Sequence, residues 1–168
     1  MRKQELLRQL IKSQANGLKI SKDIDSQVLL TALLYCESKM GTKPKPKGEP
    51  AYLPGGSQWK KEYVQEAYET YGEAAANSYG PWQVPYIVAQ RLGFTGKPED
   101  LAEPETNLHF TIQFLNQRIL KMGAKTVSQI ADCYSKNYIE RRVPHSYIRR
   151  CIQAYNGKAR EWLEGKDL

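Results

Sequence analysis

The sequence predicts an all-α or mainly α fold in a single domain. Apolar residues recur at helical spacing through most of the 168-residue chain, and no stretch shows a convincing alternating strand pattern. A chain of this length fits one compact domain. Any small sheet is expected to be confined to the Pro-rich region 41–57.

The first two expected helices differ in character. Residues 3–14 place apolar side chains on one face only, and Asn16-Gly17 ends that segment. Asp25 then supplies a capping oxygen before the run 28–36, which is apolar on almost every side. We therefore expect the second helix to be central and buried.

Residues 41–57 interleave prolines and glycines with lysines, which predicts an irregular, basic surface loop. From Trp59 onward the pattern indicates another helix, with one stripe of residues four apart: Trp59, Tyr63, Ala67 and Tyr71. Pro104 suits the first turn of a long helix. Further helices are expected over 84–92, 104–121, 126–137, 145–156 and 159–164.

Composition narrows the class of protein. With 40% hydrophobic and 26% charged residues, wholesale disorder is excluded. Three cysteines, none of them in a CxxC, argue against a disulfide framework and predict small buried hydrophobes. Only two histidines are present, too few for a His-rich zinc site, so we expect no metal and no cofactor.

The N-terminal segment carries charges in every turn and has no continuous apolar region, which argues against a signal peptide. No stretch approaches 18 uninterrupted apolar residues, so no membrane span is expected. The expectation is a chain synthesised in the cytoplasm without a signal peptide.

Glu37 closes the most apolar helix and is the candidate catalytic residue. A carboxyl group leaving such a helix into a cleft would have its pKa raised by desolvation. A glutamic acid that is protonated near neutral pH can act as a general acid toward a glycosidic oxygen. The alternative is an ordinary solvated carboxylate at a helix end.

Four blocks of sequence share the order of motifs in one known superfamily. The segment 25–38, DSQVLLTALLYCES, resembles the first motif of the lytic transglycosylase (SLT-type) and goose-type lysozyme superfamily, in which an apolar helix delivers a catalytic Glu followed by Ser. Segment 78–84, SYGPWQV, is similar to its Gly-x-x-Gln block. Segment 101–115, LAEPETNLHFTIQFL, resembles its Leu-x-Asp-Pro-x-x-Asn helix, with Glu103 in place of Asp, and 154–157, AYNG, resembles its Ala-Tyr-Asn block.

The resemblance implies a lysozyme-like fold and a role for each matching residue. Glu37 would be the acid and then the base. The implied substrate-binding positions are Trp82 and Gln83 along the sugar site, Tyr155 hydrogen-bonding near Glu37, and Ser38 and Asn156 in support. Two structural alternatives stay open: a core anchor for Trp82 and a helix C-cap for Asn156-Gly157.

The resemblance also implies the reaction. Ordinary glycosidases use two carboxyl groups, whereas a lytic transglycosylase uses one and leaves a 1,6-anhydromuramyl end on the glycan. Glu49 and Glu73 are outside candidates for a second carboxylate that would activate water. We favour the one-carboxylate mechanism, and a hydrolytic muramidase of the same fold is the alternative.

The expected organisation is one domain over 1–168, with a motif core at about 25–157 and insertions at about 41–76 and 122–147. The first insertion could form a lip over the cleft, block it or dock onto a partner. The implied partner is the peptidoglycan glycan strand at the bacterial cell wall. The enzyme would reach it by lysis, by delivery in a virion or secretion machine, or through a signal trimmed from the sequence. A phage origin is therefore a hypothesis.

Two rival functions come from other features. The segment 136–160 is strongly basic and contains several tyrosines, as a nucleic-acid-binding surface would. No helix-turn-helix, RRM or zinc signature accompanies it, which argues against nucleic acid. The second rival keeps the fold without catalysis, as a glycan-binding or structural module of a phage particle. The net charge of +7 would favour adhesion to an acidic polymer under either glycan hypothesis.

Overall fold

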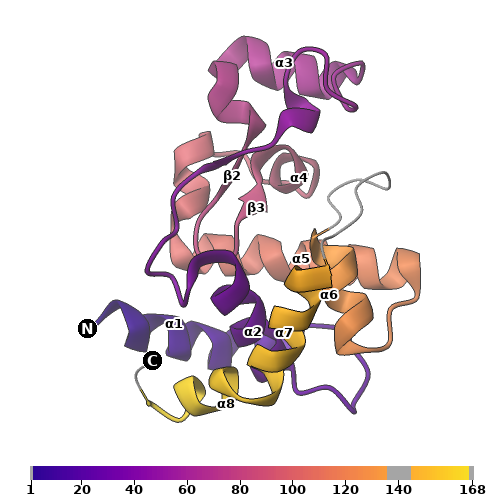
Figure 1. The fold of residues 1–168 in the computed structure, drawn as a ribbon. Coiled ribbons are helices and arrows are strands. Elements are labelled where there is room, and N and C mark those ends of the chain that lie inside the picture. Colours follow the sequence, from indigo (N-terminus) through magenta and orange to yellow (C-terminus); the bar gives the residue numbers. More distant parts are fainter. Residues whose placement is uncertain (1, 136–144, 167–168) are drawn as a thin grey trace.

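The computed structural model describes residues 2–135 and 145–166, and these residues form a mainly helical fold with one small sheet (Figure 1). The mainly α expectation is confirmed. The α-helices are α1 (Lys3–Gln14), α2 (Ser26–Ser38), α3 (Glu62–Tyr71), α4 (Tyr86–Arg91), α5 (Pro104–Met122), α6 (Val127–Ser135), α7 (His145–Asn156) and α8 (Lys158–Leu163). The strands are β1 (Lys47–Gly48), β2 (Asn77–Tyr79) and β3 (Val84–Pro85), and short 3₁₀ turns connect several elements.

Helix α2 lies at the centre of the helices that form the larger part of the molecule. Asp25 caps it, since its side-chain oxygen accepts a hydrogen bond from the Val28 backbone N–H at 3.1 Å. Its leucines are fully buried, and the helix packs against α1, α7 and α8. The expected central, buried helix is therefore confirmed. It ends at Ser38, and Lys39 follows as the C-cap in the left-handed conformation.

The apolar side chains gather into two clusters. The larger one joins α1, α2 and α5–α8 with Trp82. The smaller one lies around α3, α4 and the sheet, and it contains Tyr52, Val64 and Tyr79. Figure 1 shows α3 at one end of the molecule, the strands in the middle, and α1, α2, α7 and α8 at the other end. The insertion 41–76 thus packs into the smaller cluster together with residues of β2, β3 and α4.

The sheet is antiparallel in the order β1-β2-β3, with Lys47 opposite Ser78 and Ser78 opposite Pro85. The expectation that any sheet would be confined to 41–57 is wrong, because only β1 lies there. Strands of two or three residues are too short to show an alternating pattern. The strands bring the Pro-rich segment next to the turn that leads to Gln83.

That turn depends on glycine and on one buried asparagine. Gly80 has a φ of +80°, and a Cβ at this position would lie 2.4 Å from the side-chain nitrogen of Asn107 on α5. The Asn107 amide donates to the Tyr79 carbonyl at 2.8 Å, and its oxygen accepts from the Trp82 backbone N–H at 2.9 Å. The turn is therefore pinned to α5.

Two sequence features fall partly outside the described residues. Within the basic segment 136–160, Lys136, Arg141 and Arg142 lie outside them, as does most of the second half of the insertion 122–147.

In the part of the chain that the structure does describe, no helix combines the length and apolar character needed to cross a bilayer.

Candidate active site

The candidate site forms where the last turn of α2 meets the first turns of α7. Glu37 lies one residue before the end of α2 and is half-buried. The hydroxyl of Tyr147, on α7, donates a hydrogen bond of 2.6 Å to Glu37 Oε1. Such a short O–H···O contact is typical of a bond to a carboxylate. The hydrogen bond thus holds the carboxyl group of this half-buried residue in one orientation.

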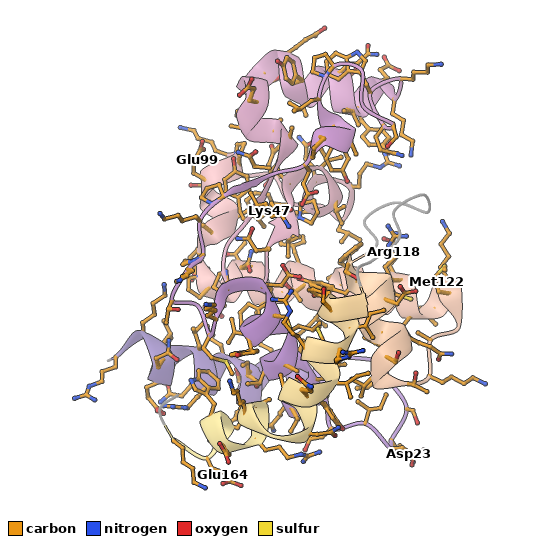
Figure 2. All side chains as sticks on the ribbon, in the orientation of Figure 1. Asp23, Lys47, Glu99, Arg118, Met122 and Glu164 are labelled. Atoms are coloured by element: carbon orange, nitrogen blue, oxygen red, sulfur yellow. The ribbon has the colours of Figure 1, made fainter. Side chains whose placement is uncertain are left out.

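Several groups act on the acidity of Glu37. Burial is the largest influence and raises its pKa from the ordinary 4.5 to about 7. The Tyr147 hydrogen bond and the positive charges of Lys47 and Arg150 lower the pKa, while the negative charge of Glu49 raises it. Lys47 belongs to β1, and Figure 2 shows it in the middle of the molecule, between α3 and the helices around α2. The net result is a carboxyl group that is about half protonated at neutral pH.

A carboxyl group with this pKa can both give and take a proton near pH 7. A general acid or base works best when its pKa lies close to the operating pH. Burial has the same effect on the general acid of lysozyme, whose carboxyl group lies in an apolar pocket while a second carboxylate nearby stays ionised. Glu37 has the environment expected of a general acid.

Glu49 is the second carboxylate that the fold brings into the neighbourhood of Glu37. It is 5% exposed, and its Oε1 accepts a 2.7 Å hydrogen bond from the Ser78 hydroxyl on β2. Its backbone N–H donates to the Ala76 carbonyl, also at 2.7 Å. Glu73 is exposed in the turn after α3 and is not among the charged groups that act on the pKa of Glu37. Glu49 is therefore the better placed of the two outside candidates.

The expected position of Tyr155 beside Glu37 is wrong. The Tyr155 hydroxyl accepts a 2.9 Å hydrogen bond from the backbone N–H of Asp25, at the opposite end of α2. Asp25 and Glu37 are separated by about 18 Å of helix, at 1.5 Å per residue. Tyr147, two turns earlier on α7, occupies the place by Glu37. The physical reason is that α7 runs antiparallel to α2, so its later residues meet the beginning of α2.

The sequence contains a signal for Tyr147 that motif matching misses. Tyr147, Cys151 and Tyr155 are four residues apart and so share one face of α7. All three bond to groups at α2: Tyr147 to Glu37, Cys151 to Cys36 and Tyr155 to Asp25. Helical spacing predicts the shared face, but it does not say which tyrosine meets Glu37.

Trp82 is a core anchor, and the expectation that it lines the sugar site is wrong. Its side chain is fully buried, and its indole N–H donates to the Leu30 carbonyl at 2.9 Å. The hydroxyl of Tyr134, on α6, donates to the Trp82 carbonyl. An aromatic ring without solvent exposure cannot stack on a sugar.

The other implied substrate-binding positions are mostly structural. The Gln83 side-chain amide donates to the carbonyls of Lys45 at 3.1 Å and Gly80 at 3.0 Å, which joins the Pro-rich segment to the turn. Ser38 donates to the Pro81 carbonyl at 2.6 Å, so the end of α2 is tied to the same turn. Asn156 is exposed at the end of α7, beyond Tyr155 and far from Glu37 along α2.

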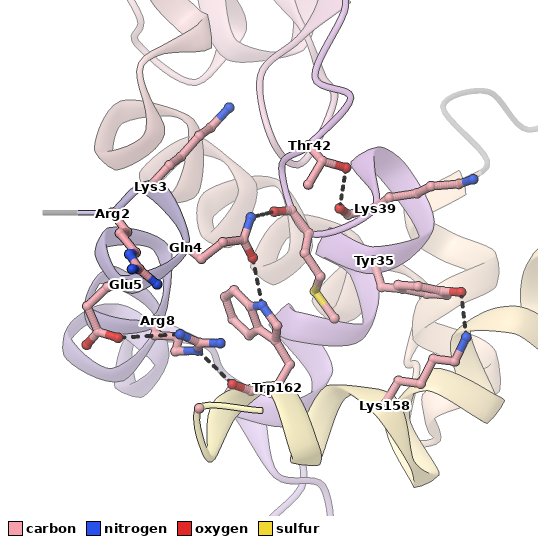
Figure 3. A pocket seen from close by; sticks show the side chains of 12 residues that line it. Arg2, Lys3, Gln4, Glu5, Arg8, Tyr35, Lys39, Thr42, Lys158 and Trp162 are labelled. Carbon is pink, nitrogen blue, oxygen red and sulfur yellow. Dashed lines mark hydrogen bonds and ion pairs between the residues drawn. The ribbon is translucent and has the colours of Figure 1, made fainter. Parts of the chain in front are cut away.

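A large basic cavity of about 930 Å³ opens on the other side of α2 (Figure 3). Tyr35 lines it and points away from the face that carries Glu37, because two residues along a helix turn the direction by about 200°. Gln4 crosses it, bonding to the Met40 carbonyl and to the Trp162 indole at 2.7 Å each. The lining cations are Arg2, Lys3, Arg8, Lys39 and Lys158, against the single acidic residue Glu5. The cavity suits an acidic ligand but offers no group for acid catalysis on a sugar bond comparable to Glu37.

Within residues 2–135 and 145–166, no three His, Cys, Asp or Glu side chains are grouped so that they could hold a metal ion. Comparisons with known proteins give no further assignment: no protein-family model, no curated protein and no solved structure matches this chain. Function is therefore inferred from the geometry around Glu37 and from the order of the sequence motifs.

Proposed function

We propose that this protein is a lytic transglycosylase that cleaves the MurNAc–GlcNAc β-1,4 bond of peptidoglycan. The observation that carries the proposal is Glu37, a half-buried carboxyl group with a pKa of about 7 that accepts a hydrogen bond from Tyr147. Its location at the end of an apolar helix, in a chain with four motif blocks in the superfamily's order, gives the substrate class.

In this mechanism Glu37 acts first as an acid. Its protonated carboxyl gives the proton to the glycosidic oxygen, and the bond to the anomeric carbon breaks. The muramyl N-acetyl group then helps to stabilise the oxocarbenium-like state. The Glu37 carboxylate next removes the proton from the sugar's own 6-hydroxyl, which attacks the anomeric carbon and forms the 1,6-anhydro ring. No water is consumed, and Glu37 ends the cycle protonated.

Tyr147 supports both steps as a positioning residue. Its bond to Oε1 fixes the plane of the carboxyl group, so Oε2 is the oxygen that transfers the proton. The same bond stabilises the carboxylate formed after the first step. Lys47 and Arg150 act in the same direction through their charges.

A hydrolytic muramidase is the second candidate, and Glu49 is the observation that favours it. Glu49 is buried, fixed by Ser78, and close enough for its charge to raise the pKa of Glu37. A second carboxylate in this position could activate water, as in a two-carboxylate glycosidase. The products distinguish the two reactions.

The test is digestion of purified peptidoglycan, with the released muropeptides identified by mass spectrometry. The wild type is compared with Glu37→Gln, Glu49→Gln and, as a matched control, Glu73→Gln on the exposed turn. We expect anhydro-ended products from the wild type and from the Glu49 and Glu73 variants, and none from Glu37→Gln. Reducing ends that disappear in Glu49→Gln would establish the hydrolase instead.

Two other outcomes would remove the catalytic proposal. Absence of products together with co-sedimentation on cell walls favours the glycan-binding or phage structural module. Tight binding to DNA that weakens steeply with salt favours the nucleic-acid hypothesis. For an active enzyme, we propose synthesis in the cytoplasm and action at the cell wall, reached by lysis, by virion delivery or through a signal trimmed from the sequence. The basic cavity and the net charge of +7 support adhesion to that acidic polymer.

A further inference from the structure

Two cysteines meet across the interface between α2 and α7. The Cys151 thiol donates to Cys36 Sγ, with the sulfur atoms 3.0 Å apart, although the residues are separated by 115 positions in the sequence. A disulfide bond is about 2.05 Å long, so an approach of about 1 Å would bring the sulfurs to bonding distance. The three cysteines are thiols in this structure.

We propose that Cys36 and Cys151 form a modification site at which a disulfide oxidant links α2 to α7. The oxidant class is a small-molecule disulfide or the disulfide form of a thiol oxidoreductase. Cys133 lies on α6 and is buried in the same core. It is the internal control, because pairing is assigned to the two sulfurs that touch.

Solvent access sets the order of the two exchange steps. Cys36 is half-buried, whereas Cys151 is fully buried. The Cys36 thiolate attacks the oxidant's disulfide, forms a mixed disulfide and releases one oxidant thiolate, which takes up a proton. The Cys151 thiolate then attacks Cys36 Sγ and releases the second oxidant thiol. The two protein thiols lose two electrons and two protons, which reduce one oxidant disulfide to two thiols.

The location connects this bond with the candidate active site. Cys36 directly precedes Glu37, and Cys151 follows Tyr147 by one helical turn on the same face of α7. Provided that the proposed function holds, the disulfide would keep Tyr147 against Glu37 after the protein has left a reducing cytosol for an oxidising envelope. The contact with Cys36 and burial raise the pKa of Cys151, which disfavours attack by Cys151 on the oxidant and leaves the first exchange step to Cys36.

Peptide mapping tests the modification without any substrate. The reduced protein is equilibrated with glutathione disulfide, alkylated, digested without reductant and analysed by mass spectrometry. We expect one linked peptide pair containing Cys36 and Cys151, two hydrogen masses lighter than the sum of its thiol forms, with Cys133 alkylated. The midpoint of thermal unfolding should rise by roughly 4 to 16 °C on oxidation. Alkylation of all three cysteines, glutathione adducts alone, or a pair that includes Cys133 would overturn the proposal.

Variants separate this result from the enzymatic proposal. Cys133→Ala should retain both the linked peptide and the thermal shift, and Cys36→Ala should lose both. Cys36 is chosen because its partial exposure makes its replacement milder than that of Cys151. In a second arm, the oxidised enzyme should release muropeptides at temperatures where the reduced enzyme has stopped. A linked peptide in an inactive protein would support the modification and refute the enzyme, whereas an active protein without the link would do the reverse.

Discussion

Replacing Glu37 by Gln should stabilise the fold at neutral pH and have little effect in acid. Burial raises the pKa of Glu37 from 4.5 to about 7, so the folded protein binds this proton more tightly than the unfolded chain does. Below pH 4.5 the protonated Glu37 therefore makes its full contribution to the free energy of unfolding of the wild type. This contribution is lost as the pH rises through 7. Gln is uncharged throughout and retains an oxygen that can accept the Tyr147 hydrogen bond.

The magnitude follows from the displacement of the pKa. A difference of about 2.5 pKa units at 1.36 kcal/mol each corresponds to roughly 3 kcal/mol of unfolding free energy above pH 7. The same relation gives about 1.4 kcal/mol at pH 5.5 and close to zero at pH 4. For a chain of 168 residues, 3 kcal/mol corresponds to a rise of about 6 to 12 °C in the unfolding midpoint.

Urea unfolding followed by circular dichroism at pH 4, 5.5 and 8 measures this difference. Glu73→Gln is the matched control, because an exposed side chain keeps its contact with water in the folded state. Its effect on stability should be small at all three values of pH. If Glu37→Gln and the wild type differ by the same amount at pH 4 and pH 8, burial does not perturb this carboxyl group, and the basis for acid catalysis is lost.

Four further variants test the parts of the structure separately. Tyr147→Phe removes a hydrogen bond that lowers the pKa of Glu37, so the alkaline limb of the pH–rate profile should move up by about one pH unit. Tyr155→Phe is the matched control: it should leave the profile unchanged and lower the free energy of urea unfolding by about 1 kcal/mol. Gly80→Ala should lower the unfolding free energy by roughly 2 to 4 kcal/mol, because a positive φ combines with a close contact to a buried amide. Arg2→Glu combined with Lys3→Glu should weaken co-sedimentation with peptidoglycan at low salt, with the difference largely gone near 1 M salt. Equal binding by this double variant and the wild type at low salt would exclude the basic cavity from adhesion.

The helices could be predicted because each has a local cause. Residues 3–14 form α1 as expected, and the capping oxygen of Asp25 starts α2 where the sequence places it. Pro104 begins α5 at the expected residue. Helical periodicity and capping act within a few residues, so they are visible without the fold. Strand β2 pairs with β1 far earlier in the chain, and β2 and β3, which pair with each other across a short turn, are too short to carry an alternating pattern.

In the candidate site, too, some residues could be predicted from local sequence and others depend on how the helices pack. Glu37 could be named as a candidate from its place at the end of an apolar helix and from the motif resemblance, but the packing against α7 that buries it could not be predicted from the sequence. Its partner could not, since two tyrosines on one face of α7 are equivalent until the direction of packing against α2 is known. For Trp82 the sequence likewise allows either a sugar-stacking role or a place in the core, and the full burial of its ring in the structure decides for the core.

The sequence blocks that resemble the superfamily serve here mainly to build the frame around Glu37. Ser38 ties the end of α2 to the Pro81 carbonyl, and Asn107 ties the same turn to α5. Gln83 then joins that turn to the segment leading into β1, which carries Lys47 and precedes Glu49. The matched residues thus fix the relative positions of the acid, the turn and the small sheet through bonds to backbone carbonyls and amides. Under the proposed function, substrate range should therefore be set by the side chains that face Glu37 from outside those blocks, and replacing them should change the products while the fold is kept.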